Sequence, residues 1–281
     1  FYKNQDDGNV YLLKHGKRNK QQTISFTDIN NHNEEIPRKE VTVEILASAK
    51  NILICVKCYQ INQVVQDISP HLNNDTKVIL CHNGMGVLDK ESLSLLNQYS
   101  VLTLLTTHGS LKTSLSSLKH TGLGQSDLGL YQGNITASDK NKLIQYFNTA
   151  IPSTTWCENI KEKQWLKLAI NGVINPITAI YDIDNGQVLA DRFSCIINEV
   201  LHEVITVAQY EGINFNFSSL REVVLQVADK TAKNSSSMRC DVQAKRDTEI
   251  THINGYIQKL GIKYKIKTPT NDNLIAQIQA L

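Results

Sequence analysis

Three polar residues recur at steps of four in the segment WLKLAINGVINPIT: Lys167, Asn171 and Asn175. In a helix this spacing places them on one stripe, each about 40° and ~6 Å from the last, with apolar residues around them. Pro176 removes a backbone donor and clashes with the carbonyl of Gly172, so we expect a kink that frees backbone groups beside Asn175. The stripe is either a solvated face before a helix stop or a site. Amides solvate a face less well than Glu or Lys, which favours a site.

A second polar cluster lies in TAKNSSSMRCDVQAKRDTE, residues 231–249. The short side chains of Asn234–Ser237 are typical of helix capping, so this segment could simply begin a helix that runs through Met238. The alternative is a binding site, which the charged residues that follow favour. Arg246 and Glu249 lie near helical register with each other, and Glu249 can pair with a lysine from elsewhere. Both interpretations stay open.

The turn LCHNGMG, Leu80–Gly86, follows an expected strand. Ligands gather beyond the carboxyl ends of parallel strands, and two glycines let the backbone approach a ligand closely. Asn-Gly is also a common tight turn. Lys57 ends another strand in CVKC, and its neighbours Cys55 and Cys58 are expected to be core thiols and not a redox pair.

Two further segments have alternative interpretations. Gly122–Asp127, GLGQSD, looks like a dinucleotide fingerprint, but its sixth residue is Asp and no helical pattern follows, so we predict a hairpin. A basic stretch follows the first expected strand and is either a solvated loop or a pocket for one phosphate. It contains Lys14, His15, Lys17, Arg18 and Lys20.

Short β-rich runs alternate with helical stretches in the first half, which predicts a parallel sheet covered by helices. The expected strands are Asn9–Leu13, Asn51–Val56, Lys77–Cys81, Val101–Thr106 and Leu128–Gln132. Gln60–Leu72 should be a crossover helix, and Ser138–Ala150 a helix capped by Ser138.

Long helical periodicities dominate the second half. They cover Glu162–Ile174, Ser194–Glu211, Ser218–Lys230 and Asp247–Leu260. We therefore expect an α/β domain over residues 1–157 and an all-helical domain over residues 158–281.

Composition narrows the class of protein. Of 281 residues, 41% are hydrophobic and 20% charged, and the net charge is +2. This excludes a disordered or fibrous chain and offers no broad positive field for nucleic acid. No apolar run approaches the ~20 residues that cross a bilayer, so we expect neither a membrane nor a nucleic-acid partner. Six scattered cysteines suit a reducing compartment, which predicts a cytoplasmic protein, and no cluster with ligand spacing argues for a metal.

Taken together, these segments resemble the ketopantoate reductases, the 2-dehydropantoate 2-reductases, over nearly the whole chain. The matching pieces are Lys57 at its strand end, HNGMG at 82–86, KLAINGVINPITA at 167–179, Asn185-Gly186, and the stretch from 235 to 256, with SSSM where the family pattern has NSSM and Asn234 before it. Several ordered motifs at family-like spacing are more specific than any one alone.

The resemblance implies an enzyme with a Rossmann-like first domain and a helical second domain that reduces 2-dehydropantoate to (R)-pantoate with NADPH. Lys167 then looks like the catalytic lysine that protonates the forming alkoxide, and Glu249 like the acidic partner that orients this lysine or a substrate hydroxyl. The residues that look like substrate ligands are Asn83, Asn171, Asn175, Asn185 and Ser237. Those that look like cofactor contacts are Lys57, Asn83, Gly84, His15, Lys17 and Arg18.

The chain departs from the family pattern at its start. No G-x-G-x-x-G unit precedes Asn9–Leu13, which resembles the family's second strand. We therefore expect the natural protein to have about 20–30 more residues upstream, enough for the missing strand, turn and helix. His15 stands where the family commonly has arginine. The positive charges around it, without an acidic residue, suit a 2′-phosphate and so favour NADPH over NADH.

Three other functions remain as alternatives. One is a related reductase of another 2-oxo acid, and a second is a non-catalytic nucleotide-binding protein. A nucleic-acid-binding module is a distant third, which the near-neutral charge opposes. A homodimer through the helical half is compatible with the sequence, but no motif indicates it.

Overall fold

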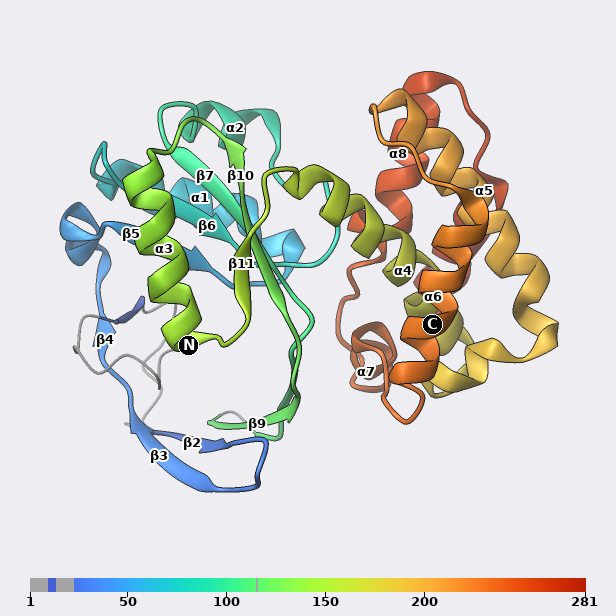
Figure 1. Cartoon of the computed structure of the whole chain (residues 1–281), viewed down its shortest axis with the longest axis horizontal. Helices are drawn as coiled ribbons and strands as arrows, with labels where there is room; N and C mark the ends of the chain where they lie inside the picture. Colours follow the sequence, from blue (N-terminus) through green and yellow to red (C-terminus); the bar gives the residue numbers. More distant parts are fainter. Residues whose placement is uncertain (1–9, 14–22, 115) are drawn as a thin grey trace. The chain divides into compact units, whose positions relative to one another are not determined.

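The computed structural model describes residues 10–13, 23–114 and 116–281. The chain divides into two compact units (Figure 1). Unit 1 contains residues up to 56, then 62–82 and 90–160, and unit 2 contains residues 57–61, 83–89 and 161–281. The basic stretch with His15, Lys17 and Arg18 lies outside the described residues. So does the start of the expected strand Asn9–Leu13, of which Leu12–Leu13 forms β1.

Unit 1 is built on a five-stranded sheet in the order β11-β10-β7-β6-β5. Its strands are β5 (Asn51–Ile54), β6 (Lys77–Leu80), β7 (Ser100–Thr106), β10 (Ser126–Gln132) and β11 (Thr154–Trp156). β5, β6 and β7 are parallel, as expected. The prediction of a parallel sheet is wrong for β10, which runs antiparallel to β7 and parallel only to β11.

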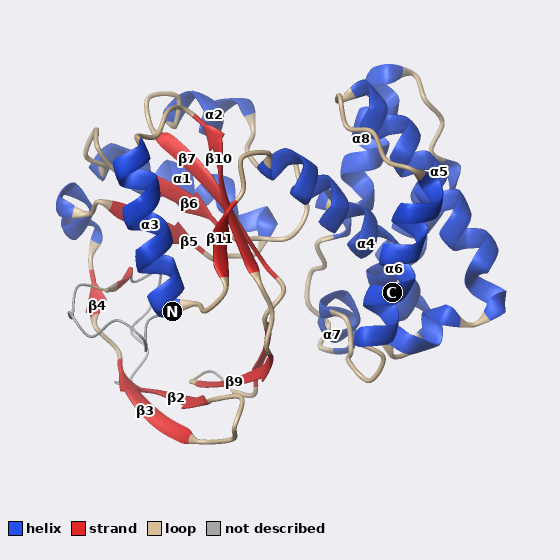
Figure 2. Ribbon diagram, in the orientation of Figure 1, coloured by secondary structure: helices blue, strands red, loops and turns tan. Residues whose placement is uncertain are grey.

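Helices cover this sheet (Figure 2). They are α1 (Ile61–Ile68), α2 (Lys90–Leu95) and α3 (Ala137–Ala150), with short 3-10 turns η2 (Val43–Ser48), η3 (Cys58–Gln60) and η4 (Ser69–His71). The crossover helix is therefore shorter than Gln60–Leu72, because 3-10 turns flank it. In α3, Leu143 and Phe147 pack onto the sheet. The cap of α3 is Thr136, whose hydroxyl accepts from Asp139 N, and not Ser138.

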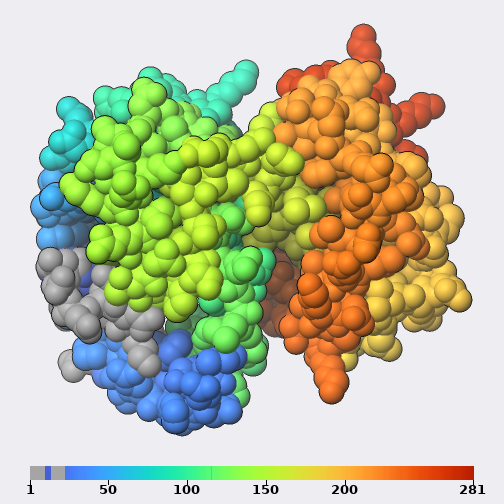
Figure 3. All heavy atoms as spheres, in the orientation of Figure 1, coloured from blue at the N-terminus to red at the C-terminus, as the bar shows by residue number. Residues whose placement is uncertain are grey.

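A second sheet, which the sequence did not indicate, has the order β3-β2-β9-β8. It contains β2 (Thr23–Thr27), β3 (Asn33–Pro37), β8 (Gly109–Lys112) and β9 (Ser117–Gly122). Figure 3 shows atoms of β2 and β3, in blue, on the surface of this unit. The short strand β4 (Glu40–Val41) pairs with β1.

The hairpin predicted at Gly122–Asp127 is wrong, because β9 and β10 belong to different sheets. β9 pairs with β8 and β10 pairs with β7, so the two arms form one long ribbon that bends between the sheets. At the bend Thr107 N donates to Gln125 O (2.9 Å), and a Cβ on Gly124 would lie 2.4 Å from His108 N. The glycine is needed because two backbone segments meet there.

Unit 2 is helical. Its helices are α4 (Ile160–Tyr181), α5 (Ser194–Tyr210), α6 (Phe217–Lys230), α7 (Ser237–Gln243), α8 (Asn254–Tyr264) and α9 (Pro269–Gln279), with 3-10 turns η5 (Asn185–Leu189), η6 (Asp191–Phe193) and η7 (Ile250–His252). α4 buries Trp165, Val173 and Ile177 in one core shared with the other helices. No helix among the described residues is both long and apolar enough to cross a membrane.

The helices of unit 2 differ from the expected ones in three places. α4 continues past Ile174 and Pro176 to Tyr181. Asp247–Leu260 is not one helix, because η7 precedes α8 and the His252 carbonyl is taken by Met85 N (2.8 Å), which removes it from any helical ladder. α9 is an additional helix.

Gly129 in β10 provides a test of the close contact at the start of α4. A Cβ at Gly129 would lie 2.5 Å from Ile160 Cβ and 2.6 Å from Cys157 O, whereas one at Gly122 would meet nothing nearer than 3.9 Å. We expect Gly129→Ala to lower the free energy of unfolding by about 1–3 kcal/mol through overpacking. The matched control Gly122→Ala should change it by less than ~0.5 kcal/mol. Urea unfolding measures both, and equal effects would contradict the contact.

His252 should make unit 2 sensitive to acid. Burial lowers the pKa of His252 from its ordinary 6.5, although contacts with Met85 and Glu249 partly offset this effect. Below pH ~6.5 the unfolded chain takes up a proton at this histidine more readily than the folded chain does. The free energy of unfolding therefore decreases as the pH falls below that value. We expect the urea midpoint of His252→Gln to fall less between pH 7.5 and 5.5 than that of wild type. His71→Gln, at an exposed position, is the control and should behave as wild type.

Candidate functional site

The polar stripe lies on α4 and is largely shielded from solvent. Lys167 and Asn171 are half-buried and Asn175 is 6% exposed, while the flanking Leu168 and Val173 are buried. A solvated face therefore does not describe Asn175. The helix brings an ammonium group and two amides to one side, where they can bind a polar ligand.

Pro176 frees a backbone carbonyl beside the stripe, as predicted. This proline has no N–H for the carbonyl of Gly172, one turn earlier. Asn254 Nδ2, at the first position of α8, donates to Gly172 O instead (2.9 Å). The freed carbonyl is therefore satisfied by a side chain.

Asn185, the first residue of η5, lies against the loop that precedes α7. Asn185 N donates to Asn234 O (3.0 Å), and Asn185 Nδ2 donates to Thr231 Oγ1 (3.0 Å). Asn185 Oδ1 is buried and has no hydrogen-bond partner within the described part of the chain. It is an acceptor without a donor, which is costly unless a ligand supplies one.

The capping interpretation of the 234–237 cluster is correct for one residue. Ser236 is the N-cap of α7, with its hydroxyl accepting from Arg239 N (3.1 Å) and contacting Thr178 Oγ1 (2.7 Å). Ser237 is the first residue of α7 and is exposed. Capping thus accounts for Ser236 and leaves the Ser237 hydroxyl at the surface of the helix start.

Glu249 is a buried carboxylate that faces polar groups from two segments. Its side chain is 5% exposed. It accepts from Cys58 N (3.2 Å) and Asn83 Nδ2 (3.0 Å), and Lys57 Nζ lies 3.9 Å away. The expected pairing of Glu249 with a lysine from elsewhere is thus present. Because a carboxylate only accepts, it turns the NH₂ group of Asn83 toward itself.

Asp241 was not predicted and is the closest partner of Lys57. Lys57 Nζ lies 2.5 Å from Asp241 Oδ2, and Arg246 Nε donates to Asp241 Oδ1 (3.0 Å). Burial alone lowers the pKa of Lys57, but the hydrogen bond to Asp241 and the charge of Glu249 outweigh it and raise that pKa. Lys57 therefore stays charged, with 34% of its side chain exposed. The signal for Asp241 was its position four residues after Ser237, on the same helical face.

Both glycines of the HNGMG turn lie against other segments of this chain. Gly84 has φ +76°, and a Cβ there would lie 2.4 Å from His252 O. Gly86 has φ +64°, and its Cβ would lie 2.5 Å from the ring of Tyr256. The turn is thereby seated on η7 and α8, which places Asn83 beside Glu249.

The two cysteines beside Lys57 lie in different environments. Cys58 is fully buried, and burial together with the charge of Glu249 raises the pKa of its thiol to about 12. Cys55 is exposed, so its assignment to the core is wrong. Both are free thiols. The described residues contain no group of His, Cys, Asp or Glu suited to a metal ion.

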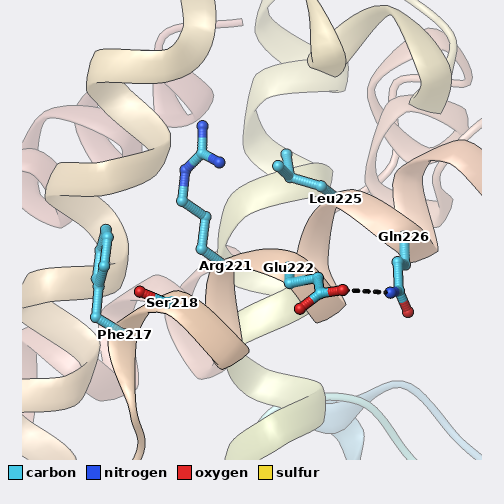
Figure 4. A pocket seen from close by; sticks show the side chains of 6 residues that line it. All are labelled: Phe217, Ser218, Arg221, Glu222, Leu225 and Gln226. Carbon is cyan, nitrogen blue, oxygen red and sulfur yellow. Dashed lines mark hydrogen bonds between the residues drawn. The ribbon is translucent and has the colours of Figure 1, made fainter.

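A separate surface depression lies on α6. Figure 4 shows its lining, which consists of Phe217, Ser218, Arg221, Glu222, Leu225 and Gln226. Arg221 is already engaged, since its Nε donates to Asn198 Oδ1 (2.8 Å). None of the predicted site residues lines this depression.

Comparison with known proteins identifies relatives over most of the chain. The family model described as "Ketopantoate reductase PanE/ApbA" matches residues 3–133, and that described as "Ketopantoate reductase PanE/ApbA C terminal" matches residues 159–281. The 2-dehydropantoate 2-reductase of Vibrio cholerae is 40% identical over 85% of this chain and 80% of its own length. That of Escherichia coli O157:H7 is 32% identical over 84% and 75%.

Solved structures share the fold. D-mandelate dehydrogenase with NADH and anilino(oxo)acetate superposes with a TM-score of 0.82 at 22% identity, covering 92% of this chain and 84% of that one. A PanE/ApbA family ketopantoate reductase from Ralstonia eutropha JMP134 gives 0.81 at 21% identity, with the same coverage. The predicted combination of a Rossmann-like α/β part and a helical part is confirmed. The chain belongs to the ketopantoate reductase family.

Proposed function

We propose that this protein reduces the ketone of 2-dehydropantoate to (R)-pantoate with NADPH, a step of pantothenate synthesis. Membership of the family and the 40% identity to the Vibrio cholerae enzyme support this activity. The observation that carries the proposal is the shielded stripe of Lys167, Asn171 and Asn175 on α4. It supplies one cation and two amides to a small polar ligand.

Lys167 is the proposed proton donor. Hydride addition to a ketone builds negative charge on the oxygen, so a cation beside that oxygen stabilises the transition state more than the ground state. An ammonium group supplies both the charge and the proton. Its half-buried position on a long helix limits its movement.

The substrate's carboxylate needs hydrogen-bond donors at fixed positions, and its hydroxyl also needs an acceptor. Asn171, Asn175 and Ser237 are the proposed ligands, and all are short side chains that lose little entropy when they bind. Asn185 Oδ1 is a buried acceptor that lacks a partner in the described chain, so a substrate hydroxyl is the donor we assign to it. That hydroxyl distinguishes 2-dehydropantoate from simple 2-oxo acids.

The proposed cofactor contacts are Lys57, Asn83 and Gly84, with His15, Lys17 and Arg18 outside the described residues. The Lys57 ammonium fits an anionic group, because it stays charged and is one-third exposed. NADPH, when bound, supplies the hydride. Glu249 orients Asn83 by accepting from its amide, and we propose that it also orients Lys167 or a substrate hydroxyl.

The proposal extends to the compartment, the binding partners and the oligomeric state of the protein. We propose a cytoplasmic enzyme without membrane or nucleic-acid partners. A homodimer is supported by one solved relative, a dimeric ketopantoate reductase from Staphylococcus aureus, which superposes with a TM-score of 0.74 at 21% identity over 96% of this chain and 89% of that one.

The activity is tested by following NADPH oxidation with 2-dehydropantoate. We expect Lys167→Ala to lose about two to four powers of ten in kcat, because general acid catalysis and charge stabilisation both disappear. Lys163→Ala, at an exposed position on the same helix, is the control and should keep wild-type kcat. A wild type that turns over pyruvate as fast as 2-dehydropantoate, or an active Lys167→Ala, would contradict the assignment.

The cofactor preference is a separate prediction. The basic residues around His15, with no acidic residue among them, favour the additional 2′-phosphate of NADPH. We expect kcat/KM with NADPH to exceed that with NADH by about tenfold or more, and Lys57→Gln to raise KM for NADPH. Equal values with the two cofactors would refute this preference.

A further inference from the structure

Asn254 makes two hydrogen bonds through one buried amide group. Its Nδ2 donates to Gly172 O (2.9 Å) and to Asn271 Oδ1 (2.9 Å), and the residue is 0% exposed. An amide nitrogen has two N–H donors, so both are used. One of them replaces the donor that α4 lacks at Pro176.

Asn271 in turn is held by a carboxylate. Asn271 Nδ2 donates to Glu203 Oε2 (2.6 Å), and so does Asn271 N (3.0 Å). Thr270 N donates to Glu203 Oε1 (2.8 Å). Glu203 on α5 therefore caps the first turn of α9, where Thr268 makes no side-chain cap.

These hydrogen bonds connect Glu203, Asn271, Asn254 and Gly172 O in a chain that we call the relay. Only one orientation of its two amide groups satisfies all of them. At one end Glu203 only accepts, so Asn271 must turn its NH₂ group toward it and its oxygen toward Asn254. At the other end Gly172 O also only accepts, so Asn254 must present its NH₂ group to both neighbours. Consequently Asn254 Oδ1 is buried without a partner among the described residues.

The unpaired Asn254 Oδ1 is a cost that the two hydrogen bonds of this side chain have to outweigh. An apolar side chain of similar size would remove this unpaired oxygen, but it would also leave Gly172 O and Asn271 Oδ1 without their donor. The amide therefore stabilises two acceptors at the cost of its own unpaired oxygen. Its specific effect is at Gly172, whose carbonyl lies in the turn between Asn171 and Asn175.

We propose that Asn254, oriented by Asn271 and Glu203, is a positioning residue for the polar stripe. By occupying Gly172 O, it keeps that turn of α4 from opening toward water, and so fixes Asn171 relative to Asn175. This inference rests on the proposed function, because it assumes that these two amides bind the substrate.

The test is Asn254→Leu, assayed with 2-dehydropantoate and NADPH. We expect KM for 2-dehydropantoate to rise about tenfold while kcat falls less, because misplaced amides weaken substrate binding. The Kd for NADPH, measured by fluorescence, should stay within about twofold. A merely structural role would instead reduce the active fraction and leave KM unchanged.

Two other variants complete the design. Val224→Ala removes buried methyl groups from α6 and should lower the melting temperature without changing KM. Glu203→Gln perturbs the far end of the relay more mildly and remains informative if Asn254→Leu fails to fold. It should raise KM in the same direction, by a smaller factor.

Hydrogen exchange separates failure of this inference from failure of the proposed function. Amides of residues 171–175 should exchange faster in Asn254→Leu and Glu203→Gln than in Val224→Ala. Unchanged KM in the variants, or unchanged exchange in that turn, would overturn the positioning role. A wild type that does not reduce 2-dehydropantoate would overturn the proposed function, while the exchange data would still decide whether the relay holds the turn.

Discussion

A missing backbone hydrogen bond in α4 is the constraint on which the helical unit depends. Pro176 leaves the Gly172 carbonyl without its helical donor, in the middle of the helix that carries Lys167 and both stripe amides. The side chain of Asn254, at the start of α8, donates a hydrogen bond to this carbonyl instead. Helices far apart in the sequence are thereby required to meet at one buried carbonyl, beside the residues that we expect to bind substrate.

Buried carboxylates organise the other polar groups in a similar manner. Glu249 binds the turn after β6 and the segment after β5, and Asp241 pairs with both Lys57 and Arg246. A buried charge is tolerated only when it is paired and hydrogen-bonded, so each carboxylate fixes the geometry of its donors. The result is a set of cations and amides whose directions are determined before any ligand arrives.

The sequence predicted what local periodicity and motif order can reveal. Parallel strands β5, β6 and β7 and the helices α5 and α6 were found because each has a clear apolar pattern. The polar stripe and Glu249 came from motif spacing. Asp241 as the partner of Lys57, the second sheet and the break before α8 were missed, because each depends on a contact between distant segments. The contact of Gly84 with His252 was missed for the same reason.

The bent ribbon of β7–β10 has a consequence for how the chain folds. Its arms are close in sequence, so their pairing closes a short loop and can form early. β2 joins β9 in parallel, at the pair Ser25 and Ser117, and this requires most of the first half to be synthesised first. The pairing of β2 with β9 is therefore the non-local step in the β3-β2-β9-β8 sheet, and it should come late, on an edge that the ribbon has already provided.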